Sequence, residues 1–424
     1  MTSQYTSNNI DAFGRERVSV PLDLFSSKQL SPNSNYFSWD IKTDKDGKSE
    51  YNQNAATTTL SVGSEQYSYA VRQSKTYHNY QPGKSQLIMM TFVLGDHTSG
   101  STDGIRKRVG LFNTHNGIFL ESRNEQVYLV IRSNESGMVI NNRVLHHNWN
   151  CDPLDGNGSS KVMLDFTKSQ IFVIDFEWLG VGCVRCGFMI DGILQLAHIF
   201  KHTNHISSVY MSSPNLPLRY EIMKTKRNTN TGSIKTICAV VMSEGGSQEV
   251  GMKKCIDTGN QSLNLSSIGT NLYPLMVLRL KQNHPFATIK INSISVITHT
   301  TNSTLYYYCV VINPIYSHTL TYTSLPHSAI EYANNNNNNV TVKGGTKIFS
   351  QYISQTNYSG SSILPNNTNF YLGSTVDVTV TDDNDQIIGS PNTVIFDTCA
   401  ICVSMYVGSN NTPFYGNVIF EETF

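Results

Sequence analysis

The sequence predicts an all-β protein, and composition, periodicity and turn signals each support that prediction. Its 424 residues include 38 Thr and 22 Tyr, residue types that fit the half-buried surface of a pleated sheet. They also include 42 Asn and 29 Gly, which supply the many turns that a protein of short strands needs. Short alternating apolar and polar runs recur from about Tyr36 onward, at a spacing typical of sandwiches and jelly rolls, without a convincing helix.

The strands predicted in the first half are rich in Val, Ile, Thr and Tyr and are bounded by turn residues. They cover residues 57–62, 67–72, 85–92, 108–112, 117–120 and 126–131. The clearest signal is a hairpin of residues 183–190 and 193–200. Asp191-Gly192 between them suits a two-residue turn, because both residues tolerate positive φ.

A second series of strands follows a polar, glycine-containing stretch at residues 243–248. These strands are expected at residues 275–280, 288–297, 304–312, 319–323, 340–342, 346–352, 374–380 and 393–407. The six Asn of 334–339 cannot pack in a core and are predicted to form a mobile loop. The first 30 residues have no sustained period. We therefore divide the chain into an extended N-terminal docking arm (1–30), a lectin-like β-sandwich domain (31–248) and a second all-β sandwich domain (249–424).

The charge balance and the lack of long apolar segments exclude several classes of function. Lys+Arg and Asp+Glu number 31 each, so the neutral chain lacks the basic footprint of a nucleic-acid or anionic-membrane binder. The N-terminus does not resemble a signal peptide, and no window approaches the roughly 18 apolar residues of a membrane helix. Eight cysteines are too few for a disulfide framework, so we expect free thiols and assembly in a reducing cytosol.

Cysteines and histidines occur in patterns that do not favour a metal site. The pairs Cys183/Cys186 and Cys399/Cys402 lie in strand-like runs, where residues three apart point to opposite faces of a sheet. His198 is expected on a strand, and His202 and His205 in the polar loop after it. We therefore predict no metal site and no cofactor.

Two acidic segments leave alternatives open. Asp152, Asp155 and Asn157 could offer oxygen ligands to calcium, although their Gly-rich segment is also a good turn. Asp175 and Glu177 are expected on one face of a strand, as the paired carboxylates of a glycosidase would be. The Glu-x-Asp-x-Glu pattern of the concanavalin-like glucanases would need a third carboxylate where this chain has Val173. We therefore predict no catalytic residue.

The segment Asp11-Ala-Phe-Gly-Arg-Glu-Arg-Val-Ser19 resembles the DAFGR-x-RVS arm of a family of virion structural proteins from tailed bacteriophages and some large DNA viruses. Further matching segments are residues 24–29, 80–88 (YQPGKSQLI), 171–182 (IFVIDFEWLGVG), 209–222 (VYMSSPNLPLRYEI) and 243–246 (SEGG). The second half matches more loosely, at residues 251–252 and 257–259. Glu16 departs from the hydrophobic residue expected there.

The resemblance implies a non-enzymatic virion component of fibre, spike or minor capsid type. Its partners would be other virion proteins and a host-surface glycan or receptor, and it would be assembled in the host cytoplasm. Fibre-like viral proteins are often trimers, so a homotrimer is expected. The first domain is expected to be a laminin-G or concanavalin-like jelly roll.

Six residues of the arm are predicted to dock it on the particle. They are the apolar anchors and cations Phe13, Arg15, Arg17, Val18, Leu22 and Phe25. A mobile arm can order on its partner, and arginines can pair there with carboxylates. Two other functions stay open: a lectin-like adhesin that binds carbohydrate through exposed tyrosines, and a polysaccharide depolymerase that uses Glu177.

Overall fold

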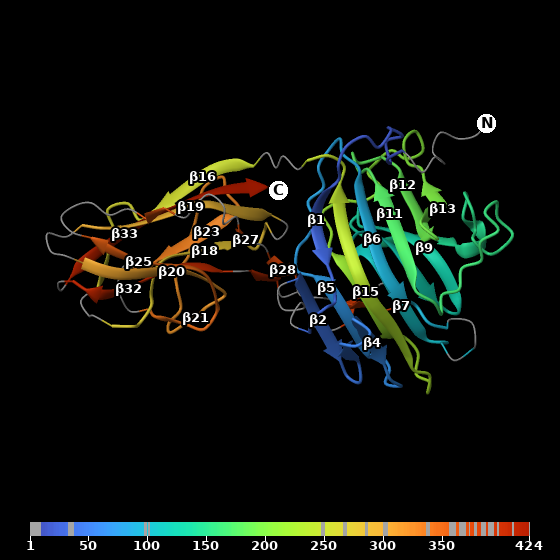
Figure 1. Ribbon diagram of the computed structural model, residues 1–424, viewed down its shortest axis with the longest axis horizontal. Coiled ribbons are helices and arrows are strands. Elements are labelled where there is room, and N and C mark those ends of the chain that lie inside the picture. The colour runs from blue at the N-terminus through green and yellow to red at the C-terminus, as the bar shows by residue number, and fades with distance from the viewer. Residues whose placement is uncertain are drawn as a thin grey trace. The chain divides into compact units, whose positions relative to one another are not determined.

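The computed structural model describes most of the chain as strands and turns. The described residues are 10–32, 38–96, 100, 102–246, 251–265, 269–284, 287–299, 304–335, 340–355, 362–363, 370–372, 374–376, 380–382, 387–388, 394–396, 398–408 and 411–423. The chain divides into two compact units, one of residues 1–248 and 378–392, the other of residues 249–377 and 393–424 (Figure 1). Each unit is described by itself below.

The first unit is built from two antiparallel sheets. Its strands are β1 (Leu22–Ser27), β2 (Trp39–Asp44), β3 (Lys48–Asn52), β4 (Thr57–Val62), β5 (Tyr69–Ser74), β6 (Gln86–Val93), β7 (Ile105–Phe112), β8 (Gly117–Arg123), β9 (Gln126–Ser133), β10 (Ile140–Leu145), β11 (Gln170–Phe176), β12 (Val184–Ile190), β13 (Ile193–Phe200), β14 (Leu218–Lys224), β15 (Gly232–Ser243), β29 (Val380–Thr381) and β30 (Ile387–Ile388). The 3-10 turn His146–Asn148 follows β10.

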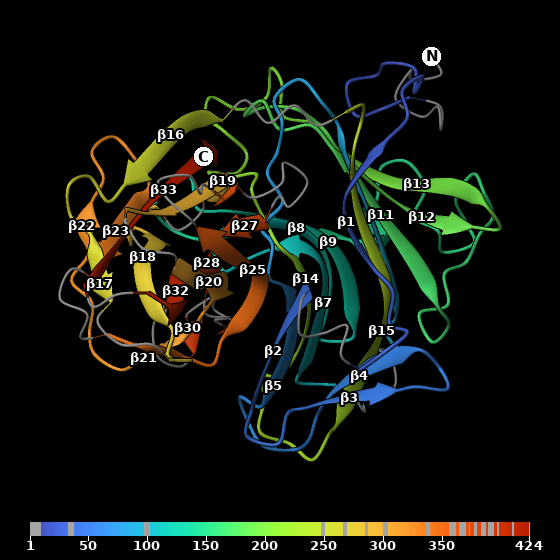
Figure 2. The same cartoon turned by 60° about the vertical axis from the view of Figure 1, so that its left-hand side comes forward.

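The two sheets pack face to face around one apolar core. The eight-stranded sheet has the order β13-β12-β11-β6-β15-β4-β3, with β1 also paired to β15. The seven-stranded sheet has the order β10-β9-β8-β7-β14-β5-β2. Figure 2 shows both layers, with β11 and β15 in one and β7 and β14 in the other. Alternate residues point inward: Phe172 and Ile174 of β11 share the core with Val109 and Leu111 of β7. The all-β prediction is confirmed, and the first half of the chain is a jelly-roll-like sandwich of the expected kind.

The predicted hairpin is present at the expected turn. Strands β12 and β13 pair in antiparallel register, with Ile190 opposite Ile193. Asp191 and Gly192 between them have φ of 50° and 77°, the positive values that such a turn needs.

The N-terminal arm differs from the prediction, because described residues within 1–30 belong to the sandwich. Strand β1 pairs with the second half of β15. Phe25 packs against Trp39 and His78 at ring-centroid distances of 5.6 and 5.2 Å. The apolar side chain that we expected to anchor a partner therefore fills a gap beside the protein's own core. Residues 1–9 lie outside the described residues.

The buried His78 gives the first unit a pH-dependent stability. Burial lowers its pKa to about 3, whereas an unfolded chain would protonate the ring near pH 6.5. The neutral ring therefore contributes full stability above pH 6.5, and this contribution is lost as the pH falls towards 3. We expect the contribution of His78 to lower the free energy of unfolding of the first unit by about 2 kcal/mol between pH 7 and pH 5.

Urea unfolding followed by tryptophan fluorescence measures this term, because all three tryptophans, Trp39, Trp149 and Trp178, lie in the first unit. The variant His78→Gln should lose that part of the pH dependence, although it is also less stable at pH 7. The control His147→Gln, at a side chain that is 71% exposed, should keep the wild-type slope. Equal slopes for His78→Gln and wild type would contradict the assignment.

The predicted domain boundaries also need a correction, because residues 378–392 belong to the first unit and not to the second. Strands β29 and β30 pair as a small hairpin. Val380 and Ile388 pack against Tyr69, Val71 and Met223 on the outer face of the seven-stranded sheet. Arg106 donates to the carbonyl oxygen of Asp382 at 2.8 Å and to that of Thr381. Apolar contacts and these hydrogen bonds explain why the segment joins this sheet.

The outer face of the seven-stranded sheet carries a buried charge network. Glu221 accepts from Arg219 at 2.6 Å, Arg106 at 3.0 Å and Arg108 at 3.4 Å. Burial alone would raise the pKa of Glu221, but the neighbouring guanidinium charges outweigh it and lower the pKa to about 2. Glu121 is held by Arg108 and Arg143, each at 2.7 Å. Each glutamate is therefore ionised and shared between arginines.

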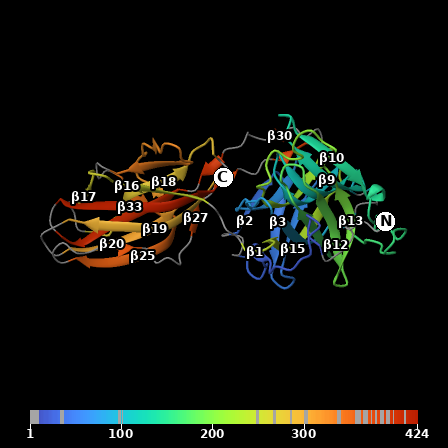
Figure 3. The same ribbon diagram turned by 90° about the horizontal axis from the view of Figure 1, so that it is seen from above.

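The second unit contains two six-stranded sheets around its own core (Figures 1 and 3). Its strands are β16 (Met252–Asp257), β17 (Leu263–Leu265), β18 (Tyr273–Leu280), β19 (Thr288–Thr298), β20 (Thr304–Ile312), β21 (Ile315–Tyr316), β22 (Thr323–Ser324), β23 (Ile330–Asn334), β24 (Val342–Lys343), β25 (Thr346–Gln355), β26 (Ser362–Ile363), β27 (Phe370–Leu372), β28 (Ser374–Val376), β31 (Val394–Phe396), β32 (Cys399–Val407) and β33 (Thr412–Thr423). One sheet contributes Ile291 and Phe420 to the core, and the other contributes Leu278 and Ile401. Of the asparagine run, residues 336–339 lie outside the described residues.

Candidate functional site

The segment that carries the family resemblance folds back on the sandwich. We call residues 10–17 the N-terminal turn. Asp11 organises it: its Oδ1 accepts from the backbone N–H groups of Phe13 and Arg15, each at 2.9 Å. Gly14, with φ of 77°, donates its N–H to the carbonyl oxygen of Asp11 at 3.0 Å. A residue with a side chain is strained at that φ, which explains glycine between Phe13 and Arg15.

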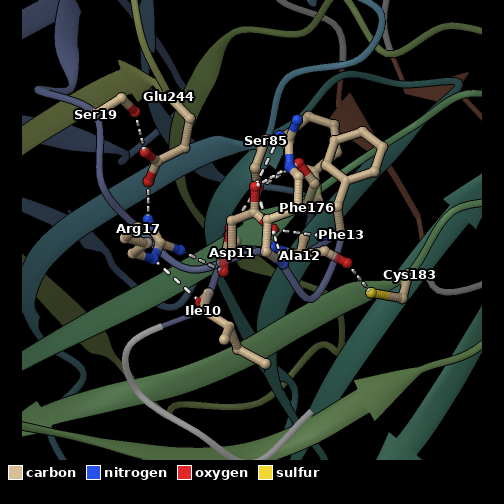
Figure 4. A network of polar contacts seen from close by, with 12 residues as sticks. Ile10, Asp11, Ala12, Phe13, Arg17, Ser19, Ser85, Phe176, Cys183 and Glu244 are labelled. Atoms are coloured by element: carbon tan, nitrogen blue, oxygen red, sulfur yellow. Dashed lines mark hydrogen bonds and ion pairs between the residues drawn. The ribbon is translucent and has the colours of Figure 1, made fainter. Parts of the chain in front are cut away.

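Arg17 fastens this turn to the eight-stranded sheet. Its Nη2 lies 2.6 Å from Oδ2 of Asp175, at the end of β11, and its Nη1 pairs with Glu244, just after β15. Ser19 donates to the other oxygen of Glu244 at 3.1 Å. Figure 4 shows Arg17, Ser19 and Glu244 together above the strands. One arginine thus joins the N-terminal turn to two strands that are distant in sequence.

Asp175 is the buried centre of the network. It is 1% exposed, and its Oδ1 accepts from Ser85 at 2.6 Å. Its Oδ2 accepts from Arg185 at 3.2 Å as well as from Arg17. Arg185 also donates to the carbonyl oxygen of Ile10 at 2.6 Å. Asp175 therefore acts as the counter-ion of two arginines that hold the N-terminal turn.

Further contacts connect the other segments of the resemblance. The backbone N–H of Glu244 donates to the carbonyl oxygen of Ser85 at 3.0 Å. Trp178 donates its indole N–H to the carbonyl oxygen of Met211 at 3.1 Å, and the Tyr210 hydroxyl donates to that of Glu177 at 2.8 Å. Segments near residues 11–19, 80–88, 171–182, 209–222 and 243–246 therefore form one connected cluster in space. Local sequence patterns gave no signal for this convergence.

The six predicted docking residues fall into two groups. Arg17 and Phe25 make contacts within the chain itself, and their contact with a partner stays a prediction. Arg17 pairs with buried carboxylates of its own sandwich, and Phe25 packs against the sandwich core.

The remaining four docking residues stay partly or fully accessible. Arg15, with a side chain 54% exposed, covers the ring of Phe13 at 4.5 Å. Val18 is 88% exposed and Leu22 39%. Val20, at 86%, is also exposed, although it is not among the six predicted docking residues.

The cysteines and the acidic turn that were considered as metal or calcium ligands make other contacts in the structure. The described residues contain no group of three or more His, Cys, Asp or Glu side chains placed to hold a metal ion. Cys186 lies in the core while Cys183 faces the N-terminal turn, and Cys399 and Cys402 belong to different apolar clusters, as the strand argument predicted. Asp152 accepts from the backbone N–H groups of Leu154 and Ser160 at 2.8 and 2.7 Å, so its segment is a hydrogen-bonded turn.

Comparisons with known proteins give likeness in fold only. No family model and no curated protein matches the chain. Among solved structures, it is similar to an endo-1,3-beta-glucanase from Streptomyces sioyaensis, at 9% identity and TM-score 0.34, over 53% of this chain and 97% of that one. It is also similar to the carbohydrate recognition domain of Emp47p, at 11% identity and TM-score 0.34, over 53% of this chain and 97% of that one. Winged bean acidic lectin is similar at 9% identity and TM-score 0.31, over 52% of this chain and 97% of that one. We draw no functional argument from these similarities. In the part of the chain that the structure describes, no helix is long and apolar enough to cross a membrane.

Proposed function

We propose that the chain is a non-enzymatic structural protein of a virus particle, docked through the residues that follow its N-terminal turn. The observation that carries the proposal is an exposed apolar strip of Val18, Val20 and Leu22, directly after the fastened Arg17. Val18, Val20 and Leu22 lie within five consecutive residues, so one partner surface can contact all three side chains. Valines that are 88% and 86% exposed would gain free energy from burial against a partner surface.

The fastened turn supports this role by fixing where the strip begins. Arg17 has two ion pairs with the sandwich on one side of the strip, and β1 pairs with β15 on the other. A strip held at both ends loses less conformational entropy on binding than a free arm would. The proposal extends the resemblance of the N-terminal motif: the partners are other virion proteins, the assembled form a homotrimer, and the site of assembly the host cytoplasm.

Incorporation into particles tests the docking strip. The double variant Val18→Asp/Val20→Asp places two charges on the strip, and we expect its incorporation to fall at least about tenfold, because desolvating unpaired charges is costly. Immunogold labelling and quantitative immunoblotting of purified particles provide the measurement. Tryptophan fluorescence should show an unchanged unfolding midpoint for the first unit.

Leu30→Asp is the matched control, because Leu30 is 73% exposed and lies outside the strip. It should be incorporated like the wild type. Normal incorporation of the double variant would refute the docking strip, and absence of the wild-type protein from opened particles would refute the virion role.

No contact among the described residues favours a depolymerase. Asp175 is enclosed by Ser85, Arg17 and Arg185, so its carboxylate is not accessible as a nucleophile or a general acid beside Glu177.

A further inference from the structure

A small pocket lies where the N-terminal turn meets the end of the hairpin β12–β13. Its volume is about 180 Å³, below the roughly 300–1,000 Å³ typical of pockets for drug-sized ligands. Ala12 and Phe13 of the turn line it on one side. Residues that line the rest include Glu177, Cys183, Lys201, His202, Thr203 and His205. The size suits a ligand of one ring.

The turn is attached directly to the pocket wall. Cys183 donates its thiol hydrogen to the carbonyl oxygen of Ala12 at 2.8 Å (Figure 4). Burial raises the pKa of Cys183 to about 12, so the sulfur keeps the hydrogen that this bond needs. The wall that carries Phe13 is thus held by this bond as well as by Arg17.

The polar groups of the pocket offer both hydrogen-bond acceptors and donors. His202 Nδ1 lies 2.6 Å from the carbonyl oxygen of Gly182 and its ring stacks on Tyr210, at a centroid distance of 4.2 Å. Burial lowers the pKa of His202 and so favours the neutral ring. Because Nδ1 lies beside a carbonyl oxygen, Nδ1 carries the hydrogen and Nε2 is left as an acceptor. Glu177 uses Oε1 to accept from the backbone N–H of Cys183 at 3.3 Å. Lys201 supplies an ammonium donor.

We propose that this pocket binds a single sugar ring of a glycan. A carboxylate, an ammonium and a neutral imidazole together match hydroxyl groups, which both donate and accept, better than they match an ion of either sign. The ring of Phe13 offers an apolar face for the carbon-bound hydrogens of the sugar. Glu177 and His202 accept from sugar hydroxyls, and Lys201 donates to them.

The inference deepens the proposed function and rests on it for its biological meaning, since a glycan on the host surface would be the outward partner. It also connects the two sites, because the N-terminal turn both precedes the docking strip and forms one wall of the pocket.

Saturation-transfer NMR on the isolated full chain tests the pocket. The probes are glucose, galactose, mannose, N-acetylglucosamine and N-acetylneuraminic acid, each at millimolar concentration. We expect at least one to bind, and Glu177→Gln and Phe13→Ala each to weaken binding about tenfold or more, since each removes a principal contact. Glu177→Gln keeps the size of the side chain and an acceptor for Cys183, so loss of binding is not explained by unfolding.

Met138→Ala, at a remote side chain that is 71% exposed, is the control and should bind like the wild type. A blank panel, or binding that survives both pocket variants, would overturn the proposal. Because Val18→Asp/Val20→Asp is assayed by incorporation and leaves the pocket intact, failure of the glycan site and failure of the docking strip give different results.

Discussion

The variant Glu221→Gln should lower the free energy of unfolding of the first unit by about 3–5 kcal/mol, the usual cost of breaking a buried ion pair from one side. Glu221 is 1% exposed and interacts with Arg106, Arg108 and Arg219. Glutamine keeps the shape but removes the charge, so three buried cations lose a shared counter-ion. Urea unfolding at pH 7, followed by tryptophan fluorescence, measures the loss.

The control Asp103→Asn removes an exposed ion pair with Lys226, whose side chains are 43% and 50% exposed. Pairs of this kind contribute less than about 1 kcal/mol, so the control should unfold nearly like the wild type. The dependence of stability on pH in the acid range supplies a second check. With its pKa lowered to about 2, Glu221 stabilises the folded first unit fully above pH 4.5, and this stabilisation is lost as the pH falls towards 2. Glu221→Gln should make the free energy of unfolding depend less on pH in this range. An unchanged pH dependence together with an unchanged urea midpoint would contradict the stabilising role of Glu221.

The variant Asp175→Asn should release the N-terminal turn. Asp175 is the counter-ion of Arg17 and Arg185, so its neutralisation removes a buried carboxylate from both guanidinium groups, and Arg17 keeps its ion pair with Glu244. We expect the turn to lose about 3 kcal/mol of local stability, which corresponds to at least about a hundredfold faster amide exchange. Hydrogen exchange measured by mass spectrometry on peptides that cover residues 10–17 provides the test.

Arg15→Ala is the matched control within the same turn. Arg15 pairs with Asp11 but its side chain is 54% exposed, so the loss should stay under about 1 kcal/mol. Equal exchange of residues 10–17 in Asp175→Asn and Arg15→Ala would show that the ion pairs of Arg17 do not hold the turn.

Local patterns predicted the features that depend on neighbours in sequence. The turn at Asp191-Gly192 and the opposite orientation of Cys399 and Cys402 follow from strand geometry and from the φ that a residue tolerates. The all-β class followed from the same local signals.

Features that depend on distant partners were missed. Arg17 and Asp175 are 158 residues apart, and Arg17 and Glu244 are 227 apart, so no local period reveals that they meet. The arginine and the carboxylates were each visible as charges, but the sequence did not show that the partners belong to the same chain. Strands β29 and β30 have two residues each, too few for an alternation to be recognised.

The assignment of residues 378–392 to the first unit has a consequence for how the protein breaks. The polypeptide passes between the two units three times, after residues 248, 377 and 392. After a single proteolytic nick at residue 248, residues 1–248 would therefore be held to the rest of the chain only by the non-covalent contacts of the hairpin β29–β30. A recombinant fragment that ends at residue 248 would lack Val380 and Ile388, and its Tyr69, Val71 and Met223 would lose an apolar cover.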